Sequence, residues 1–158
     1  MGKKVGGRPP VAPDPETAKP DPKSQRNFTD PESRIMVDGA TKAFVQAYNA
    51  QAVADDASQI IVAADLSQQC NDKQQLVPMM AQVLNNLGEL PTNTSADAGY
   101  FSEDALSAPG LVGTNLHVPT GRQKHGATSV QAADPPDEKS SRKAQMQHKL
   151  ATPAGREV

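Results

Sequence analysis

The sequence predicts an α/β fold in which a mixed sheet is flanked by helices. Three observations carry this prediction: two strand-like segments at 43–54 and 59–66, an amphipathic helix pattern that ends near residue 87, and a short strand candidate at 92–96 that leads into an acidic residue. Strands that alternate with helices in this order are compatible with a three-layer domain whose sheet combines antiparallel and parallel pairs.

The two strand-like segments are separated by a short polar cluster, Asp55-Asp56-Ala57-Ser58. In the first segment, Phe44 and Tyr48 are four residues apart, so in a strand their side chains would lie on the same face. The second segment, from Gln59 to Leu66, is a continuous apolar run rich in β-branched residues, which is typical of a strand buried on both faces. We therefore predict an antiparallel hairpin whose strands are 43–54 and 59–66.

The helix prediction rests on an apolar stripe at the spacing i, i+3, i+4, i+7, i+8 and i+11. The stripe consists of Leu76, Met79, Met80, Val83, Leu84 and Leu87. Asn71-Asp72 offers an N-cap and Gly88 a C-terminal cap. Pro78 removes a hydrogen bond beyond the first turn, so either the helix is kinked there or its regular part starts just before it. Because this spacing is the normal signature of core packing, we assign the stripe no cofactor.

The rest of the middle segment holds shorter elements. The strand candidate at 92–96 ends at Asp97, and Gly99 allows a tight exit from it. Residues 102–106 predict a short capped helix, and 116–118 predict one more short strand. A last helix at 140–150 has almost no apolar face, so it would be marginal alone.

Composition divides the chain into three parts. Seven of its 14 prolines lie in residues 1–34, which we interpret as a Pro-rich disordered linker. Residues 35–120 carry a net charge of −7 and form the more apolar core segment, whereas residues 121–158 carry a net charge of +3 and form a basic polar tail, part of it helical. The length of 158 residues gives room for one modest domain, and an aromatic content of 3% argues against a large core.

No segment predicts a membrane span or a secretory signal. The longest strongly apolar run, 60–64, is far too short to cross a bilayer, and the N-terminus has no apolar segment behind it. Cys70 is the single cysteine, so it cannot form an internal disulfide and is interpreted as an ordinary reduced thiol. We therefore expect a cytoplasmic protein that does not bind membranes.

Five stretches of the sequence carry a family resemblance. They are Gln25-Arg26-Asn27-Phe28-Thr29-Asp30-Pro31-Glu32-Ser33-Arg34-Ile35-Met36, Phe44-Val45-Gln46-Ala47-Tyr48-Asn49-Ala50-Gln51-Ala52, Ile60-Ile61-Val62-Ala63-Ala64-Asp65 with Asn71-Asp72-Lys73-Gln74-Gln75-Leu76-Val77-Pro78-Met79, Ala96-Asp97-Ala98-Gly99-Tyr100-Phe101-Ser102, and Thr120-Gly121-Arg122-Gln123-Lys124-His125. In their joint order and spacing, from about residue 23 to about residue 155, they resemble the DDE-type transposases of bacterial insertion sequences.

This resemblance implies a ribonuclease H-like catalytic domain that cleaves and transfers DNA strands with the help of metal ions. The family's first acid lies on the first strand, its second follows the fourth strand, and its third, a Glu, sits on a later helix. The Asp-Ala-Gly-Tyr signature assigns the second acid to Asp97. Residues 43–54 and 59–66 correspond to the second and third strands, 72–87 to the first helix, and 92–96 to the fourth strand.

Two of the family's three acids have no counterpart in this sequence. The first Asp belongs upstream of the Pro-rich stretch, and the helix that carries the Glu belongs where the chain ends. Asp38 lies in a loop before the second strand, and Glu157 lacks the Tyr, Arg and Lys neighbours of that helix. We therefore expect a partial ribonuclease H-like fold without its first strand and its catalytic-Glu helix, with an unpaired sheet edge and marginal stability.

Asp97 is the candidate catalytic and metal-binding residue. DDE transposition uses two Mg²⁺ ions, roughly 3.5–4 Å apart, that need hard oxygen ligands. One carboxylate cannot fix two ions, so we expect weak or absent Mg²⁺ binding and no DNA cleavage or joining by this chain alone. In the alternative interpretation, Asp97 only favours the start of a short helix. Asp65 either lies near the metal-binding acids without binding the ions itself or is a solvated residue at a strand end. Asn71-Asp72 is interpreted as a helix cap.

Arg122, Lys124 and His125 form a basic cluster that could hold DNA phosphates, through contacts that are blind to sequence and sensitive to salt. The alternative is an exposed basic loop with no specific partner. Expected partners are DNA and a second transposase chain, either another copy of this chain or a full-length enzyme.

The sequence leaves two functional hypotheses open. The first is the central segment of a DNA transposase, and the second is a non-catalytic remnant that at most binds DNA or a full-length transposase. An unrelated small α/β domain is a third interpretation. Upstream and downstream reading frames for the two missing acids would establish that the chain derives from a complete gene.

Overall fold

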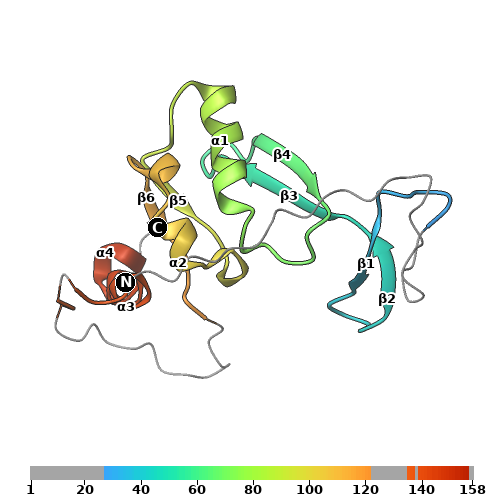
Figure 1. Ribbon diagram of the computed structural model, residues 1–158. Helices are drawn as coiled ribbons and strands as arrows, with labels where there is room; N and C mark the ends of the chain where they lie inside the picture. The colour runs from blue at the N-terminus through green and yellow to red at the C-terminus, as the bar shows by residue number, and fades with distance from the viewer. Residues whose placement is uncertain (1–26, 122–134, 138, 157–158) are drawn as a thin grey trace, which may run out of the picture. The chain divides into compact units, whose positions relative to one another are not determined.

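The computed structural model describes residues 27–121, 135–137 and 139–156 of the 158-residue chain. By its contacts, the chain divides into Met1–Pro31 and Glu32–Val158. Within the first unit, the side chain of Asn27 accepts hydrogen bonds from the backbone amides of Thr29 and Asp30, at 3.0 and 3.2 Å. This is a local turn of the kind that Asn side chains favour. The strands and helices described below belong to the second unit (Figure 1).

The second unit begins with a hairpin that the sequence patterns do not predict. Strands β1 (Arg34–Val37) and β2 (Phe44–Ala47) pair antiparallel. In the turn between them, Asp38 Oδ1 accepts hydrogen bonds from the amide of Thr41 at 2.6 Å and from its hydroxyl at 2.7 Å. The prediction of one strand over 43–54 is therefore wrong in its first part, because the chain changes strand partner one residue after β2 ends.

Strands β3 (Asn49–Ala54) and β4 (Ile61–Ser67) form an antiparallel hairpin and confirm that part of the prediction. Helix α1 packs against this hairpin, and the sheet face that carries Val53 and Ala63 contributes to the core. The opposite face is open, and the side chain of Leu66 is 63% exposed. The expectation of a strand buried on both faces is thus wrong, because the described residues cover this two-stranded sheet on one side only.

Helix α1 spans Leu76–Leu87, and the predicted apolar stripe is buried from Leu76 to Val83, whereas Leu84 and Leu87 at its end are exposed. It begins after Gln75, so the predicted cap at Asn71-Asp72 is wrong. Pro78 is the third residue of the helix and lies in the first turn, where a backbone N–H has no helical acceptor to lose. Gly88 ends the helix with φ 80°, in the left-handed conformation expected of a C-terminal cap.

Strands β5 (Asn93–Ser95) and β6 (Asn115–His117) pair in parallel. The connection between them contains the 3₁₀ turns η1 (Ala98–Tyr100) and η2 (Pro109–Leu111) and the short helix α2 (Glu103–Leu106). Ser102 caps α2, as its sequence predicts, by accepting a hydrogen bond from the Ala105 amide at 3.1 Å. From β3 onward, the order strand, strand, helix, strand, short helix, strand is the predicted one.

The last helical region comprises α3 (Arg142–Ala151) and α4 (Pro153–Arg156), which places α3 close to the predicted helix at 140–150. Met146 is buried within the hydrophobic core. The ammonium of Lys149 donates a hydrogen bond to the backbone carbonyl of Leu116 in β6. These tertiary contacts stabilise a helix whose own apolar face is narrow.

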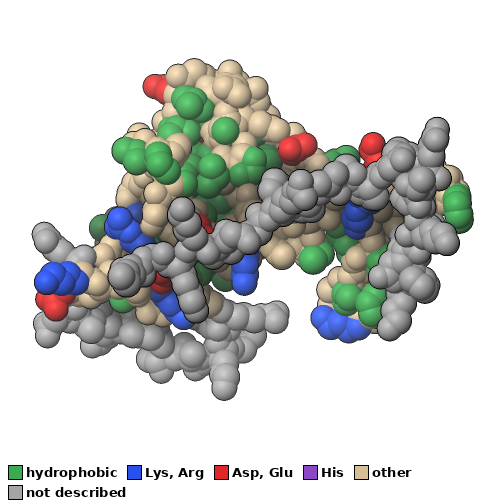
Figure 2. Space-filling model, in the orientation of Figure 1, with side chains coloured by type: hydrophobic (Ala, Val, Ile, Leu, Met, Phe, Trp, Pro, Cys, Tyr) green, Lys and Arg blue, Asp and Glu red, His purple; other side chains and the backbone are tan. Residues whose placement is uncertain are grey.

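The core is built from α1, the β3–β4 hairpin, α2, η2, β6 with the residue that follows it, and α3. Its most deeply buried side chains are Met80, Val83 and Val118. The strands of the described residues form three separate two-stranded sheets, so this part of the chain is mixed α/β without the single mixed sheet predicted from the sequence. Apolar side chains also lie at the surface around α1 (Figure 2), where Leu84 and Leu87 are exposed. Among the described residues, no helix is long and apolar enough to cross a membrane.

His117 makes the stability of this core sensitive to pH. Burial lowers the pKa of His117 below its usual value of 6.5, and the nearby ammonium of Lys149 lowers the pKa further. Because the unfolded chain then binds the proton more readily, His117 contributes stability that is present above pH 6.5 and is lost as the pH falls.

We therefore expect the free energy of unfolding, measured in urea, to decrease from about pH 7.5 to about pH 5.5, and to decrease less steeply in a His117→Gln variant. In a Lys149→Met variant, an NMR titration should show the pKa of His117 raised toward its usual value. Equal slopes in the parent and His117→Gln proteins would contradict this assignment.

Candidate functional site

Asp97 lies between β5, which ends at Ser95, and η1, which begins at Ala98; only Ala96 separates it from the end of the strand. Its backbone is extended, and its carboxylate is exposed. Asp97 Oδ1 accepts a hydrogen bond from the backbone amide of Gly99 at 2.5 Å, so the side chain caps the 3₁₀ turn. The structural role that the sequence offered as an alternative for Asp97 is therefore present, and it occupies one carboxylate oxygen.

A second carboxylate approaches the same turn. A Cβ atom placed on Gly99 would lie 2.8 Å from Asp97 Oδ1 and 3.0 Å from Asp72 Oδ2. Both oxygens therefore converge on a space that exists because residue 99 has no side chain. The pairing of Asp72 with Asp97 is not predicted from the sequence, where Asp72 is interpreted as a helix cap.

Asp72 is held in this position by amide side chains from β3. Its Oδ1 accepts hydrogen bonds from Asn49 Nδ2 at 2.7 Å and from Gln51 Nε2 at 2.9 Å. Gln51 is buried, its Nε2 also donates to Asn49 Oδ1 at 2.8 Å, and its Oε1 accepts a hydrogen bond from the hydroxyl of Tyr100. A continuous polar chain thus links η1, β3 and the segment that precedes α1. We call Asn49, Gln51, Asp72, Asp97 and Tyr100 the polar cluster.

The electrostatics of the polar cluster keep the Tyr100 hydroxyl protonated. Burial raises the pKa of Tyr100 above its usual value of 10.0, and the carboxylates of Asp72 and Asp97 raise it further. Negative charge nearby disfavours the phenolate, so the hydroxyl remains a hydrogen-bond donor to Gln51. Both acids therefore act on one buried network while Asp97 itself stays open to solvent.

Each of the two carboxylates has one oxygen, Oδ2, that takes no part in the hydrogen bonds described above. Those bonds fall on Oδ1 of each acid, and Mg²⁺ binds through one or two carboxylates and completes its shell with water or phosphate oxygens. Over residues 27–121, 135–137 and 139–156, no group of three or more His, Cys, Asp or Glu side chains is arranged to hold a metal ion. A two-ion centre would need further ligands beyond Asp72 and Asp97.

Of the other candidate site residues, the structure describes Asp65 and Asp38. Arg122, Lys124 and His125 lie outside the residues that the structure describes, as does Glu157. Asp65 lies in β4 opposite Gln51 and is exposed, and its Oδ1 accepts a hydrogen bond from the Leu66 amide at 2.8 Å. The carboxylate of Asp38 is committed to the β1–β2 turn.

Comparison of the chain with protein-family models, with curated proteins and with solved structures finds no match.

Gly99 offers a direct test of how the two carboxylates converge. In a Gly99→Ala variant the new Cβ would overlap Asp97 Oδ1 and Asp72 Oδ2. Displacing them weakens the cap and the bonds from Asn49 and Gln51, so we expect the free energy of unfolding to fall by about 1–3 kcal/mol, at about 1 kcal/mol per hydrogen bond.

Gly110 supplies the matched control, because it also lies in a 3₁₀ turn and a Cβ there meets nothing within 4 Å. Gly110→Ala should leave stability unchanged or raise it by about 0.4–1 kcal/mol, since alanine restricts the unfolded chain. Urea unfolding of the two variants measures the contrast. Equal effects of the two substitutions would show that the carboxylates do not meet at Gly99.

Proposed function

We propose that this chain is the central part of a DNA transposase with a ribonuclease H-like catalytic domain, and that Asp97 is the second of its three catalytic acids. In the complete enzyme, Asp97 would bind Mg²⁺ during the cleavage and transfer of DNA strands. The chain by itself does not cut or join DNA, because it supplies neither of the other two acids.

The observation that carries this proposal is the position of Asp97. It follows the carboxyl end of a strand that belongs to a parallel pair, and a second carboxylate converges on the adjacent Gly99. A residue at a strand end is held rigidly and is open to solvent, which suits a ligand for a metal that must also contact DNA. The hydrogen bond to the Gly99 amide uses Oδ1, so Oδ2 can serve a cation.

The strand arrangement also favours a part of a larger sheet. Parallel strands normally occur in sheets with several members that are covered on both faces. Here β5 and β6 form a parallel sheet of two, and the β3–β4 hairpin forms another sheet with one open face. Both features fit a domain from which the family's first strand is absent.

A second candidate function is that of a non-catalytic remnant that binds DNA or a full-length transposase. The absence of a three-acid cluster among the described residues and the capping role of Asp97 Oδ1 favour this alternative. The two candidates share a fold. They differ only in whether this segment belongs to a complete, catalytically active enzyme.

The nucleotide sequence around the coding region tests the proposal first. We expect an upstream frame that encodes a strand ending in Asp and a downstream frame that encodes a helix carrying Glu. The second test compares the isolated chain with a chain extended by both segments, in a Mg²⁺-dependent strand-transfer assay on DNA that carries the element's ends. The extended chain should be active and the isolated chain inactive.

Flanking DNA without either frame would remove the basis for the transposase proposal. Nicking of the DNA by the isolated chain, if it depended on a divalent metal and disappeared in Asp97→Asn, would instead overturn the claim that this chain is inactive alone.

A further inference from the structure

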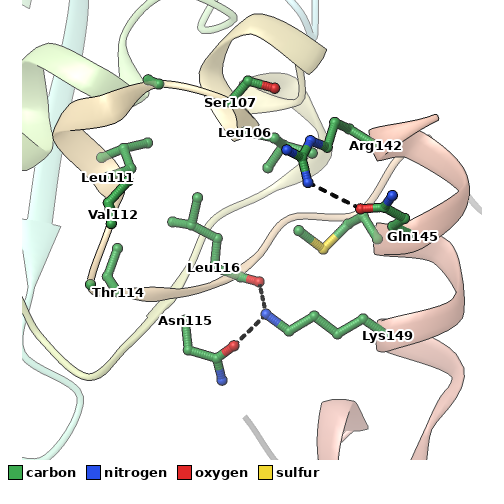
Figure 3. Close-up of a pocket in the computed structure, with 13 residues that line it drawn as sticks. Leu106, Ser107, Leu111, Val112, Thr114, Asn115, Leu116, Arg142, Gln145 and Lys149 are labelled. Atoms are coloured by element: carbon green, nitrogen blue, oxygen red, sulfur yellow. Dashed lines mark hydrogen bonds between the residues drawn. The ribbon is translucent and has the colours of Figure 1, made fainter. Parts of the chain in front are cut away.

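A cavity of about 360 Å³ lies between α3 and the segment that runs from α2 through η2 to β6 (Figure 3). Its apolar wall includes Leu106, Leu116 and Met146. This volume falls at the small end of the range for ligand-binding sites, which are typically apolar with a few placed polar groups. The cavity is separate from the polar cluster, because none of the five residues of that cluster lines it.

The charged groups of the cavity are both cationic. Arg142 and Lys149 come from α3 and are seven residues apart, so they lie on the same side of the helix about two turns from each other. Among the described residues that line the cavity, none is Asp or Glu. The cavity therefore combines an apolar wall with two positive charges that no lining carboxylate offsets.

The hydrogen bonds of the two cations leave donors for a ligand. The ammonium of Lys149 donates to Asn115 Oδ1 at 2.5 Å and to the carbonyl of Leu116, which uses two of its three N–H groups. Arg142 Nη1 donates to Gln145 Oε1 at 3.2 Å, and a guanidinium has five N–H groups in all. Figure 3 shows Lys149 reaching from α3 to Asn115 and Leu116, and the guanidinium of Arg142 directed to Gln145.

Burial of Lys149 supports an anionic ligand. Desolvation lowers the pKa of Lys149 below its usual value of 10.5, so its charged form is less stable here than in water. An anion bound beside it would offset that loss, because an opposite charge favours the ammonium.

We propose that this cavity binds a small organic anion, a carboxylate with a short aliphatic chain. The carboxylate accepts hydrogen bonds from Arg142 and Lys149, and the chain packs on Leu106, Leu116 and Met146. A guanidinium matches the planar geometry of a carboxylate and can bind it through two parallel hydrogen bonds. The apolar wall selects an anion with a hydrocarbon chain over a bare inorganic one.

The probe is hexanoate, titrated into the full chain and followed by the NMR signals of the Leu116 and Met146 methyl groups. We expect saturable shifts at these methyls. Hexanol, which has the same chain length without a charge, and inorganic phosphate, which has charge without a chain, should each bind at least about tenfold more weakly, as expected when a charged hydrogen bond or the apolar contact is lost.

Three variants separate recognition from folding. Arg142→Met and Lys149→Met should each weaken hexanoate binding at least about tenfold, since each removes a charged donor. Lys143→Met is the matched control on the same helix, because Lys143 is exposed and does not line the cavity, and it should bind hexanoate like the parent chain. Lys149 also ties α3 to β6, so Arg142→Met decides the result if Lys149→Met loses helical circular dichroism.

The proposal is overturned if the parent chain shows no saturable shifts with hexanoate, or if hexanol binds as tightly as hexanoate. It is also overturned if phosphate binds as tightly as hexanoate, or if Lys143→Met weakens binding as much as Arg142→Met does. None of these results bears on the role of Asp97, because the cavity and the polar cluster share no residue.

Discussion

Replacement of Met80 by alanine is expected to lower the free energy of unfolding by about 2–5 kcal/mol, the usual effect of truncating a large buried side chain. Met80 lies in the middle of α1 and is 1% exposed, so truncation removes apolar contacts and leaves a cavity in the core. A loss of this size is a large fraction of the about 5–15 kcal/mol by which folded domains are usually stable. Urea unfolding followed by circular dichroism measures the effect.

Leu87→Ala is the control for this experiment. Leu87 is on the same helix and its side chain has the same number of heavy atoms as that of methionine, but it is 55% exposed. We expect this substitution to cost less than about 1 kcal/mol, because most of its apolar surface is already in water. Similar losses for the two variants would mean that α1 does not pack through the face that carries Met80.

If the proposed function is right, Asp97→Asn in the extended, complete chain is expected to reduce the rate of DNA strand transfer by about 100- to 1000-fold. A bound metal ion supplies several kcal/mol of charge stabilisation in the transition state, and each 1.36 kcal/mol corresponds to about tenfold in rate. Asparagine keeps an oxygen that can accept the Gly99 amide, so the cap of the 3₁₀ turn is preserved while the negative charge is lost. The measurement is single-turnover strand transfer in Mg²⁺.

Asp104→Asn serves as the matched control, since Asp104 is an exposed acid in the first turn of α2, seven residues further along the chain. Its rate should stay within about twofold of the parent, because an exposed acid at a helix start contributes only about 0.3–1 kcal/mol to stability and contacts no metal. A rate for Asp97→Asn equal to that for Asp104→Asn, with the fold intact in both, would remove Asp97 from the catalytic centre.

The elements that the sequence predicts well are those with a strong local pattern. The stripe from Leu76 to Leu87 repeats over three helical turns, and α1 occupies that range. The hairpin of β3 and β4 follows from two extended runs around a polar turn. Ser102 is recognisable as a cap because the residue type and its position before Glu103 and Asp104 indicate the start of a helix.

The elements that the sequence does not predict are those that depend on which other strand a segment pairs with. Residues 43–54 look like one strand because both halves are extended, yet the first half pairs with β1 and the second with β4. Alternation of side chains reports the conformation of a segment and says nothing about the change of partner at Tyr48. The apolar run of β4 likewise predicted burial on two faces, and only one face is covered by the described residues.

The residues of the candidate site also fall into two groups, those that the sequence could indicate and those that only the tertiary structure brings to the site. Asp97 could be singled out from the Ala-Asp-Ala-Gly-Tyr string, but nothing local to Asp72 or Gln51 indicates that they belong beside it. Asp72 and Asp97 are 25 residues apart in the sequence, and they meet at Gly99 while β3 holds both ends of the cluster, through Asn49 and Gln51 on Asp72 and through Gln51 on Tyr100. The buried side chain of Gln51 would have indicated the cluster, because a buried amide needs hydrogen-bond partners. Its burial, however, is known only once the tertiary structure is known.

The sequence by itself determined the mixed α/β class, the order of elements from β3 to β6, and the part of the helix face, from Leu76 to Val83, that enters the core. Each of these follows from periodicity and capping within a few residues. Only the tertiary structure decided the three separate sheets, the pairing of Asp72 with Asp97, and the docking of α3 through Met146 and Lys149. These depend on contacts between distant segments, whose free energy comes from burial and hydrogen bonding that no local pattern records.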